Sequence, residues 1–151
     1  MTGHQNAACA RAALDDPDNK RRVFDAVVFD QSIPNDTRWA MVSGFWAQAR
    51  TSPQSYAPFV EDYFNALERV WADNTFHTAE DIVTLMFPSD IAGYADGVDL
   101  VASGQKWIDA HSGASAALIR IIRERMDVAR RQVEAQAADK QQITPILCKP
   151  L

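Results

Sequence analysis

The feature that most constrains this chain is the spacing of its large apolar residues between positions 58 and 72. Seven of them recur with the period of an α-helix and form one wide face: Phe59, Val60, Tyr63, Phe64, Leu67, Val70 and Trp71. Charged and amide side chains occupy the other side, and Pro58 stands where the first helical turn tolerates a missing N–H. The pattern predicts an amphipathic helix that buries one face.

Helical spacing continues on both sides of this segment, and no window of six or more residues alternates apolar with polar as a half-buried strand does. Asp16 and Pro17 predict the cap and first residue of a helix that follows a short Ala-rich helix. A further helix is expected over residues 36–49. Gly44 inside it indicates a close contact with another helix.

The second half of the sequence predicts more helices of the same kind. Thr78 and Asp81 have the spacing of a capping box, which opens a short helix that Pro88 ends. A long helix is expected from about residue 114 to residue 138. It presents one apolar face, so it packs by that face alone.

The free energies indicate that these helices stack on one another. Ordering fifteen backbone residues costs about 15 to 30 kcal/mol, whereas burying seven large apolar side chains returns about 10 to 20 kcal/mol. No single helix is therefore stable alone. We predict one all-α domain, built as antiparallel helix pairs in a HEAT-like superhelical array or as an irregular bundle.

Charge and cysteine content narrow the possible partners. Fifteen basic against twenty acidic residues give a net charge of -5, which disfavours nucleic acid and anionic membranes as partners. No stretch approaches eighteen uninterrupted apolar residues, so no membrane span is expected. Cys9 and Cys148 lie near opposite ends without any metal-binding spacing, which favours a reducing, cytoplasmic location.

Catalytic motifs are absent from the sequence. It has no HExxH zinc motif, no GxSxG and no Gly-rich phosphate loop. The nearest approach is the run from His77 to Asp81, in which Glu80 follows an isolated histidine. A helix cap explains this run better, and a metal hydrolase built around His77 and Glu80 is the remote alternative. We expect no catalytic residue and no metal ligand in this chain.

One polar feature is a candidate recognition site. Arginines follow the apolar face of the last predicted helix and can bind the carboxylate of a peptide: Arg120, Arg123, Arg130 and Arg131. In the alternative interpretation these side chains are solvated and pair with Glu124, Asp127 and Glu134 on the same helix.

Three stretches together resemble a known family. They are Ser32-Ile33-Pro34-Asn35, the run from Ala57 to Phe64 that continues to Val70-Trp71-Ala72, and the run from Ile82 to Pro88. In order and spacing they are similar to the C-terminal helical domain of bacterial aminopeptidase N, a zinc exopeptidase. The resemblance implies a HEAT-like superhelix that packs on a thermolysin-like catalytic domain and closes the peptide chamber. The zinc ligands of that family lie upstream and have no matching position here.

The resemblance divides the chain into a disordered segment 1–7, the helical domain 8–138 and an irregular tail 139–151. It implies a non-catalytic part of a zinc aminopeptidase, whose partners are the catalytic domain, which holds the zinc, and a peptide substrate. The chain itself would need no cofactor. A free-standing helical-repeat scaffold that binds another protein is the alternative function. The Ala-rich opening lacks strong polar caps, so self-association through an uncapped apolar face is expected.

Overall fold

The computed structural model describes the backbone of residues 2–147 and the side chains of residues 2–141. The described part of the chain contains helices and no strand, which confirms the all-α prediction. The α-helices are α1 (Gly3–Ala12), α2 (Pro17–Phe29), α3 (Asn35–Phe45), α4 (Pro58–Asp73), α5 (Phe76–Met86), α6 (Leu100–Ala110) and α7 (Ala116–Leu147). Three 3₁₀ turns join them: η1 (Trp46–Gln48), η2 (Pro53–Tyr56) and η3 (Ser89–Ile91).

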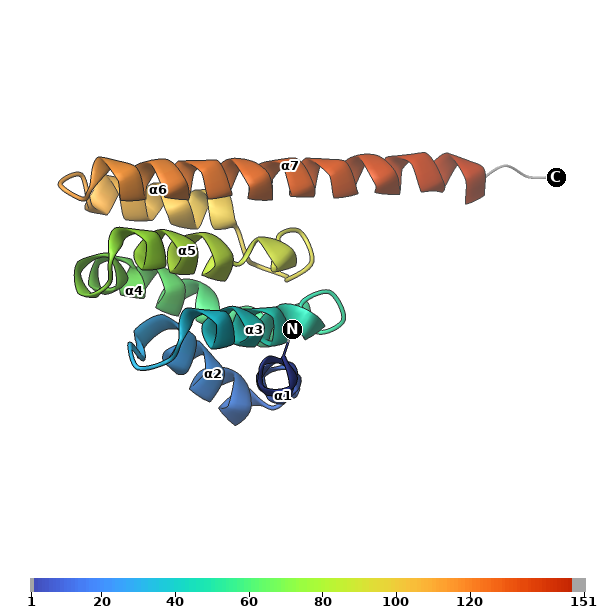
Figure 1. Ribbon diagram of the computed structural model, residues 1–151. Helices are drawn as coiled ribbons and strands as arrows, with labels where there is room; N and C mark the ends of the chain where they lie inside the picture. The colour runs from blue at the N-terminus through green and yellow to red at the C-terminus, as the bar shows by residue number, and fades with distance from the viewer. Residues whose placement is uncertain (1, 148–151) are drawn as a thin grey trace.

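The helices lie in successive layers from α1 and α2 at one end to α7 at the other (Figure 1). Helix α1 packs on α3, α4 on α5, and α6 on α7, while α5 also contacts α7. The pairs α4–α5 and α6–α7 are neighbours in sequence joined by short connections, whereas α1–α3 and α5–α7 each pack across an intervening helix. The specific HEAT-like superhelix stays a prediction.

Aromatic side chains from four elements form the centre of the first layers. The Phe45 ring lies 5.3 Å from that of Tyr56 and 5.4 Å from that of Phe59, both edge to face, and the Phe24 ring lies 5.2 Å from that of Phe59. Such pairs stabilise a core by about 0.5 to 1.5 kcal/mol beyond the area they bury. The apolar face predicted for residues 58–72 is the buried face of α4, so that prediction is confirmed.

The contact predicted for Gly44 is confirmed between α3 and α1. A Cβ atom at this position would lie 2.2 Å from the Cys9 carbonyl oxygen and 2.7 Å from the Ala12 Cβ. Helix α1 buries only Ala8 and Ala12. Small residues on both helices therefore let the two backbones approach closely.

The prediction of a disordered segment 1–7 is wrong for the residues that the structure describes, because α1 already begins at Gly3. Thr2 Oγ1 accepts a hydrogen bond from the Gln5 backbone N–H at 3.3 Å, and the Gln5 side chain accepts one from the Thr2 N–H at 2.8 Å. This capping box satisfies two N–H groups at the helix start.

The capping box predicted at Thr78 and Asp81 is also wrong. Helix α5 begins one turn earlier, at Phe76, and Thr75 Oγ1 accepts the Thr78 N–H at 3.4 Å. The helix expected over residues 36–49 divides into α3 and η1, because the chain tightens into a 3₁₀ turn after Phe45.

The irregular tail predicted for 139–151 is wrong over 139–147, where α7 continues to Leu147. Cys148–Leu151 lie outside the described residues. No glycine or proline stands between Ala116 and Thr144 to end the helix. The C-terminal part of α7 extends beyond the other helices (Figure 1).

Arg38 is a buried cation that organises the turn between α2 and α3. Its side chain is 2% exposed, and its guanidinium donates to the carbonyl oxygens of Val27, of Asp30 at 3.0 Å and of Ile33 at 3.4 Å. Burial lowers the pKa of Arg38. The last carbonyl oxygens of a helix lack backbone N–H partners within the helix, and Arg38 supplies the missing donors at the end of α2.

Candidate functional site

The four arginines singled out from the sequence lie exposed on one side of α7. Arg120 pairs with Glu124 at 3.6 Å, and Arg131 pairs with Asp127 at 3.3 Å. These pairs join residues one turn apart, as expected on a helix surface.

Arg130 is held most firmly. It donates to Asp127 Oδ1 at 2.5 Å and to Glu134 Oε1 at 2.9 Å. The hydrogen bond from Arg130 lowers the pKa of Asp127, and the bond to Asp127 raises the pKa of Arg130. The predicted pairing with Glu124, Asp127 and Glu134 is therefore confirmed.

Arg123 differs from the other three. Within the described part of the chain its exposed guanidinium has no hydrogen-bond or ion-pair partner. It is thus the arginine of this set that can bind an external carboxylate without giving up a bond inside α7.

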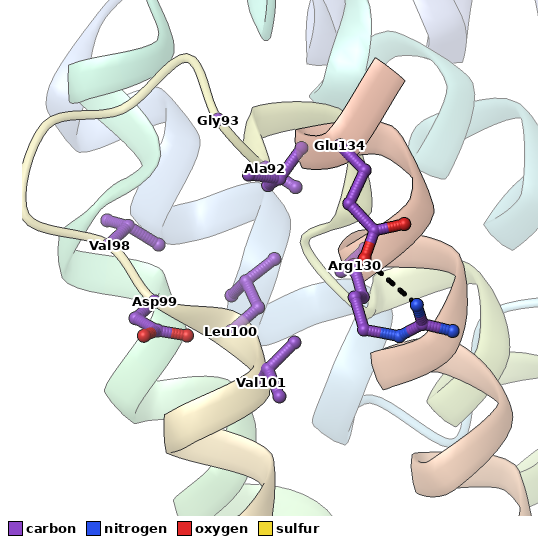
Figure 2. A pocket seen from close by; sticks show the side chains of 10 residues that line it. Ala92, Gly93, Val98, Asp99, Leu100, Val101, Arg130 and Glu134 are labelled. Carbon is purple, nitrogen blue, oxygen red and sulfur yellow. Dashed lines mark hydrogen bonds and ion pairs between the residues drawn. The ribbon is translucent and has the colours of Figure 1, made fainter. Parts of the chain in front are cut away.

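A groove of about 300 Å³ lies beside Arg130, between α7 and the segment that leads into α6. Figure 2 shows Arg130 and Glu134 on the α7 side and the residues from Ala92 to Val101 on the other. Its apolar lining is formed by Ala92, Val98, Leu100, Val101, Ala129 and Val133. Val133, on α7, is 45% exposed at this groove. The groove can hold an apolar group next to a paired arginine.

Two glutamines of α7 hold the segment around Ala92, which forms part of the facing wall of this groove. Gln132 donates to the carbonyl oxygens of Ser89 at 2.9 Å and Ala92 at 3.1 Å, and Gln136 donates to Ala92 at 3.0 Å. Gly93 adopts φ +79°, and a Cβ atom there would lie 2.4 Å from Gln136 Oε1. A glycine is therefore required for this contact.

The remote metal alternative finds no support in the side-chain arrangement. His77 is exposed and its ring lies 5.8 Å from that of Phe76. Among residues 2–141, no three His, Cys, Asp or Glu side chains come together in a way that can hold a metal ion. Over the same part of the chain, no helix has both the length and the apolar character to cross a membrane.

Two buried cations were missed by the sequence analysis. Arg38 is one, and Lys20 is the other, with only 2% of the residue exposed. Nothing in the local sequence distinguishes them from exposed cations, since their burial depends on contacts from other helices.

The amino-acid sequence is similar to part of a known enzyme. No family model matches it. It is 31% identical over 138 residues to aminopeptidase N of Streptomyces lividans, and the match covers 91% of this chain. The matched stretch is 15% of the length of that relative. An all-helical chain of this kind is consistent with the resemblance noted in the sequence, and the chain is therefore similar to a small part of an aminopeptidase N.

Proposed function

We propose that this chain is the non-catalytic C-terminal domain, or a fragment, of a zinc aminopeptidase, which removes N-terminal amino acids from peptides. The observation that carries the proposal is the 31% identity that extends along 91% of the chain. In this role the helical layers close the substrate chamber and stabilise the enzyme. A cytoplasmic location belongs to the same proposal.

The chemistry would come from a separate catalytic domain. Zinc peptidases of this class bind the metal through an HExxH helix, and the present sequence has no such motif. The zinc would therefore be held outside this chain. What this chain supplies is a packed helical surface.

The arginines of α7 are the proposed contact with the peptide. Arg120, Arg130 and Arg131 each have a carboxylate partner, so a peptide carboxylate would have to compete for them. Arg123 can bind a peptide carboxylate without first releasing a carboxylate of this chain. In the assembled enzyme, Arg123→Ala should therefore raise the peptide KM more than Arg120→Ala does. Arg11→Ala, at an exposed arginine on α1, is the control. Equal KM values for all variants would exclude this surface from substrate binding.

Binding to a catalytic part tests the proposal most simply. The partner is the Streptomyces lividans enzyme from which the matching stretch has been removed. Sedimentation of the mixture should give a one-to-one complex, and the complex should unfold at a higher temperature than the truncated enzyme alone. No complex at about 100 μM of each component would count against the proposal, because a domain interface is expected to hold well below that concentration.

A free-standing helical-repeat scaffold is the second candidate function. The observation that favours it is the apolar groove beside α7, with Val133 exposed at its edge. Capture of one reproducible partner unrelated to aminopeptidases, lost on Val133→Asp, would support the scaffold.

Self-association of the isolated chain also remains a prediction. Leu14, two residues after the end of α1, is 57% exposed. If the opening helix mediates contact between copies, sedimentation should show a dimer that Leu14→Ser abolishes.

A further inference from the structure

The segment between η3 and α6 contains the chain's one Asp–Gly pair, Asp96–Gly97, and the sequence has no Asn–Gly pair. Both residues are exposed. Figure 2 shows the segment as an arch between Gly93 and Val98, beside the groove that α7 borders. A Cβ atom at Gly97 would meet nothing within 4 Å, so no other segment packs against this residue on that side.

The two groups that can react with each other at this pair are both unpaired. In the described part of the chain, the Asp96 carboxylate makes no ion pair and no hydrogen bond, and the Gly97 N–H donates to no acceptor. Glycine has no Cβ that would shield its amide nitrogen from the preceding side chain. The nearby Asp99 differs, because its carboxylate accepts the Ala102 N–H at 3.0 Å. Asp96 is therefore free to react with the residue that follows it.

The reaction is the formation of a succinimide. The Gly97 amide nitrogen attacks Cγ of the Asp96 carboxyl group, an N–Cγ bond forms, and the C–OH bond breaks. The hydroxyl leaves with the amide proton as water, so the step needs no oxidant and no cofactor. Water then opens the ring. Opening at Cγ restores aspartate, whereas opening at the former main-chain carbonyl gives isoaspartate, which lengthens the main chain by one methylene.

The native turn holds the two reacting groups apart. The Val98 N–H donates to the Ala95 carbonyl oxygen at 3.4 Å, and Gly97 has φ +74° while Asp96 does not have a positive φ. These are the features of a type II turn, in which ψ of the second residue is about +120°. Ring closure requires the Gly97 nitrogen to eclipse Asp96 Cβ about the Cα–C bond, and in a type II turn these two atoms are about 120° apart. The turn must therefore open before the ring can close.

Gln54 of η2 is the side chain that holds this turn closed. Its Oε1 accepts the Asp96 N–H at 3.0 Å, and its Nε2 donates to the Asp96 carbonyl oxygen at 3.4 Å. One side chain from a distant segment thus binds both backbone groups of the reacting residue. Rotation about the Asp96 Cα–C bond moves the carbonyl oxygen, so the motion that the reaction requires breaks the hydrogen bond from Gln54.

We propose that Asp96–Gly97 is a site of spontaneous isoaspartate formation and that Gln54 slows the reaction by holding the turn closed. The longer main chain of isoaspartate no longer fits the hydrogen bond between Ala95 and Val98. The same segment forms the facing wall of the groove beside α7, so the modification changes the shape of that groove. The inference does not depend on the proposed function, because the reaction needs only this turn and water.

Incubation of the full chain at neutral pH and body temperature tests the site. Peptide mapping by mass spectrometry detects the succinimide as a loss of one water, and methylation of the free α-carboxylate by an isoaspartyl methyltransferase measures the isoaspartate. The folded parent chain should form isoaspartate at Asp96 more slowly than the same chain unfolded in urea. Gln54→Ala should form it about tenfold faster than the folded parent, because the two hydrogen bonds that oppose opening are lost.

Matched variants separate the turn from general stability. Gln54 is exposed, so its variants should fold. Gln54→Glu keeps the acceptor for the Asp96 N–H but lacks the donor for the carbonyl oxygen, so it should also react faster than the parent. Gln31→Ala removes an exposed glutamine that donates to the Asp73 carbonyl oxygen at 2.9 Å and should react at the parent rate. Asp96→Glu, which would have to close a larger ring, should give no such product.

Two results overturn the proposal. One is isoaspartate formation by Gln54→Ala that is no faster than by the parent or by Gln31→Ala, which would mean that Gln54 does not guard the turn. The other is a folded parent chain that reacts as fast as the unfolded chain, which would mean that the native turn does not hold the Gly97 nitrogen away from Asp96.

Discussion

Gly44→Ala tests the packing of α1 against α3. A glycine in a helix interior is about 1 kcal/mol less favourable than alanine, so propensity alone predicts a more stable protein. The structure predicts the opposite, because the new Cβ would lie 2.2 Å from the Cys9 carbonyl oxygen and 2.7 Å from the Ala12 Cβ. The nearest atom belongs to the backbone and cannot rotate away.

Two terms set the expected magnitude. Overpacking of this kind costs about 1 to 3 kcal/mol, and the gain in helix propensity offsets about 1 kcal/mol of that. Because the clash is with a backbone oxygen at 2.2 Å, the upper part of that range applies, about 2 to 3 kcal/mol. After the propensity gain, the free energy of unfolding should fall by about 1 to 2 kcal/mol. For a chain of this size the melting temperature should fall by about 2 to 8 °C. Urea denaturation followed by tryptophan fluorescence measures the free energy, and hydrogen exchange in α1 locates the loss.

Two further glycines give matched controls. A Cβ atom at Gly3 meets nothing within 4 Å, so Gly3→Ala should not destabilise the protein. A Cβ atom at Gly104 meets Met126 Sδ at 2.5 Å, but a methionine can change rotamer, so Gly104→Ala should cost less than Gly44→Ala. If Gly44→Ala were as stable as Gly3→Ala, the close packing of α1 on α3 would be refuted.

Three other predictions follow from particular contacts. Arg38→Met should lower the free energy of unfolding by about 2 to 4 kcal/mol, measured by urea denaturation, because it leaves the buried carbonyl oxygens without a donor. The hydrogen bond from Lys20 lowers the pKa of Asp15, so the stability it contributes is present above the unfolded pKa of about 4 and is lost as pH falls through the folded pKa. Melting curves from pH 6 to pH 2 should therefore show Asp15→Asn less stable than the parent chain at pH 6, with the difference shrinking in acid; a constant difference would exclude this ion pair. Gly93→Ala should cost about 1 to 2 kcal/mol by urea denaturation, because a positive φ is strained for alanine and the new Cβ meets Gln136. If Gly93→Ala left the free energy of unfolding unchanged, the turn at Gly93 would not be packed against Gln136 of α7.

Local signals made much of the fold predictable. The cap at Asp16 and the proline starts at Pro17 and Pro58 act within one helical turn, and the structure places α2 and α4 at those residues. The apolar period of residues 58–72 identified the buried face of α4, because a helix repeats its contacts every 3.6 residues.

The starts of α1 and α5, which the sequence analysis misplaced, are also marked by capping residues within one helical turn. Thr2 and Gln5 have the capping-box spacing, so the start of α1 could have been found from the sequence. Near α5 the sequence offers two threonines, and only the packed helix shows that Thr75 is the cap. Two candidates a turn apart fit the local rules equally well.

The candidate sites depended on contacts between distant segments. Periodicity placed the α7 arginines on one side of a helix, and the ion pairs within that helix followed from their spacing. The contact of Gln54 with the turn at Asp96 joins residues 42 positions apart, which no local pattern connects. Burial of Lys20 and Arg38 likewise arises from tertiary packing, so sequence alone gave no sign of it.

The most direct test of the account measures aminoacyl-arylamide turnover and zinc content of the purified chain, alone and mixed with the truncated Streptomyces lividans enzyme. We predict no turnover and no stoichiometric zinc for the chain alone, and higher turnover by the truncated enzyme when the chain is added. Turnover by the chain alone that survives repurification and disappears with His77→Ala would contradict the account, because it would place catalysis in a chain assigned only a structural part.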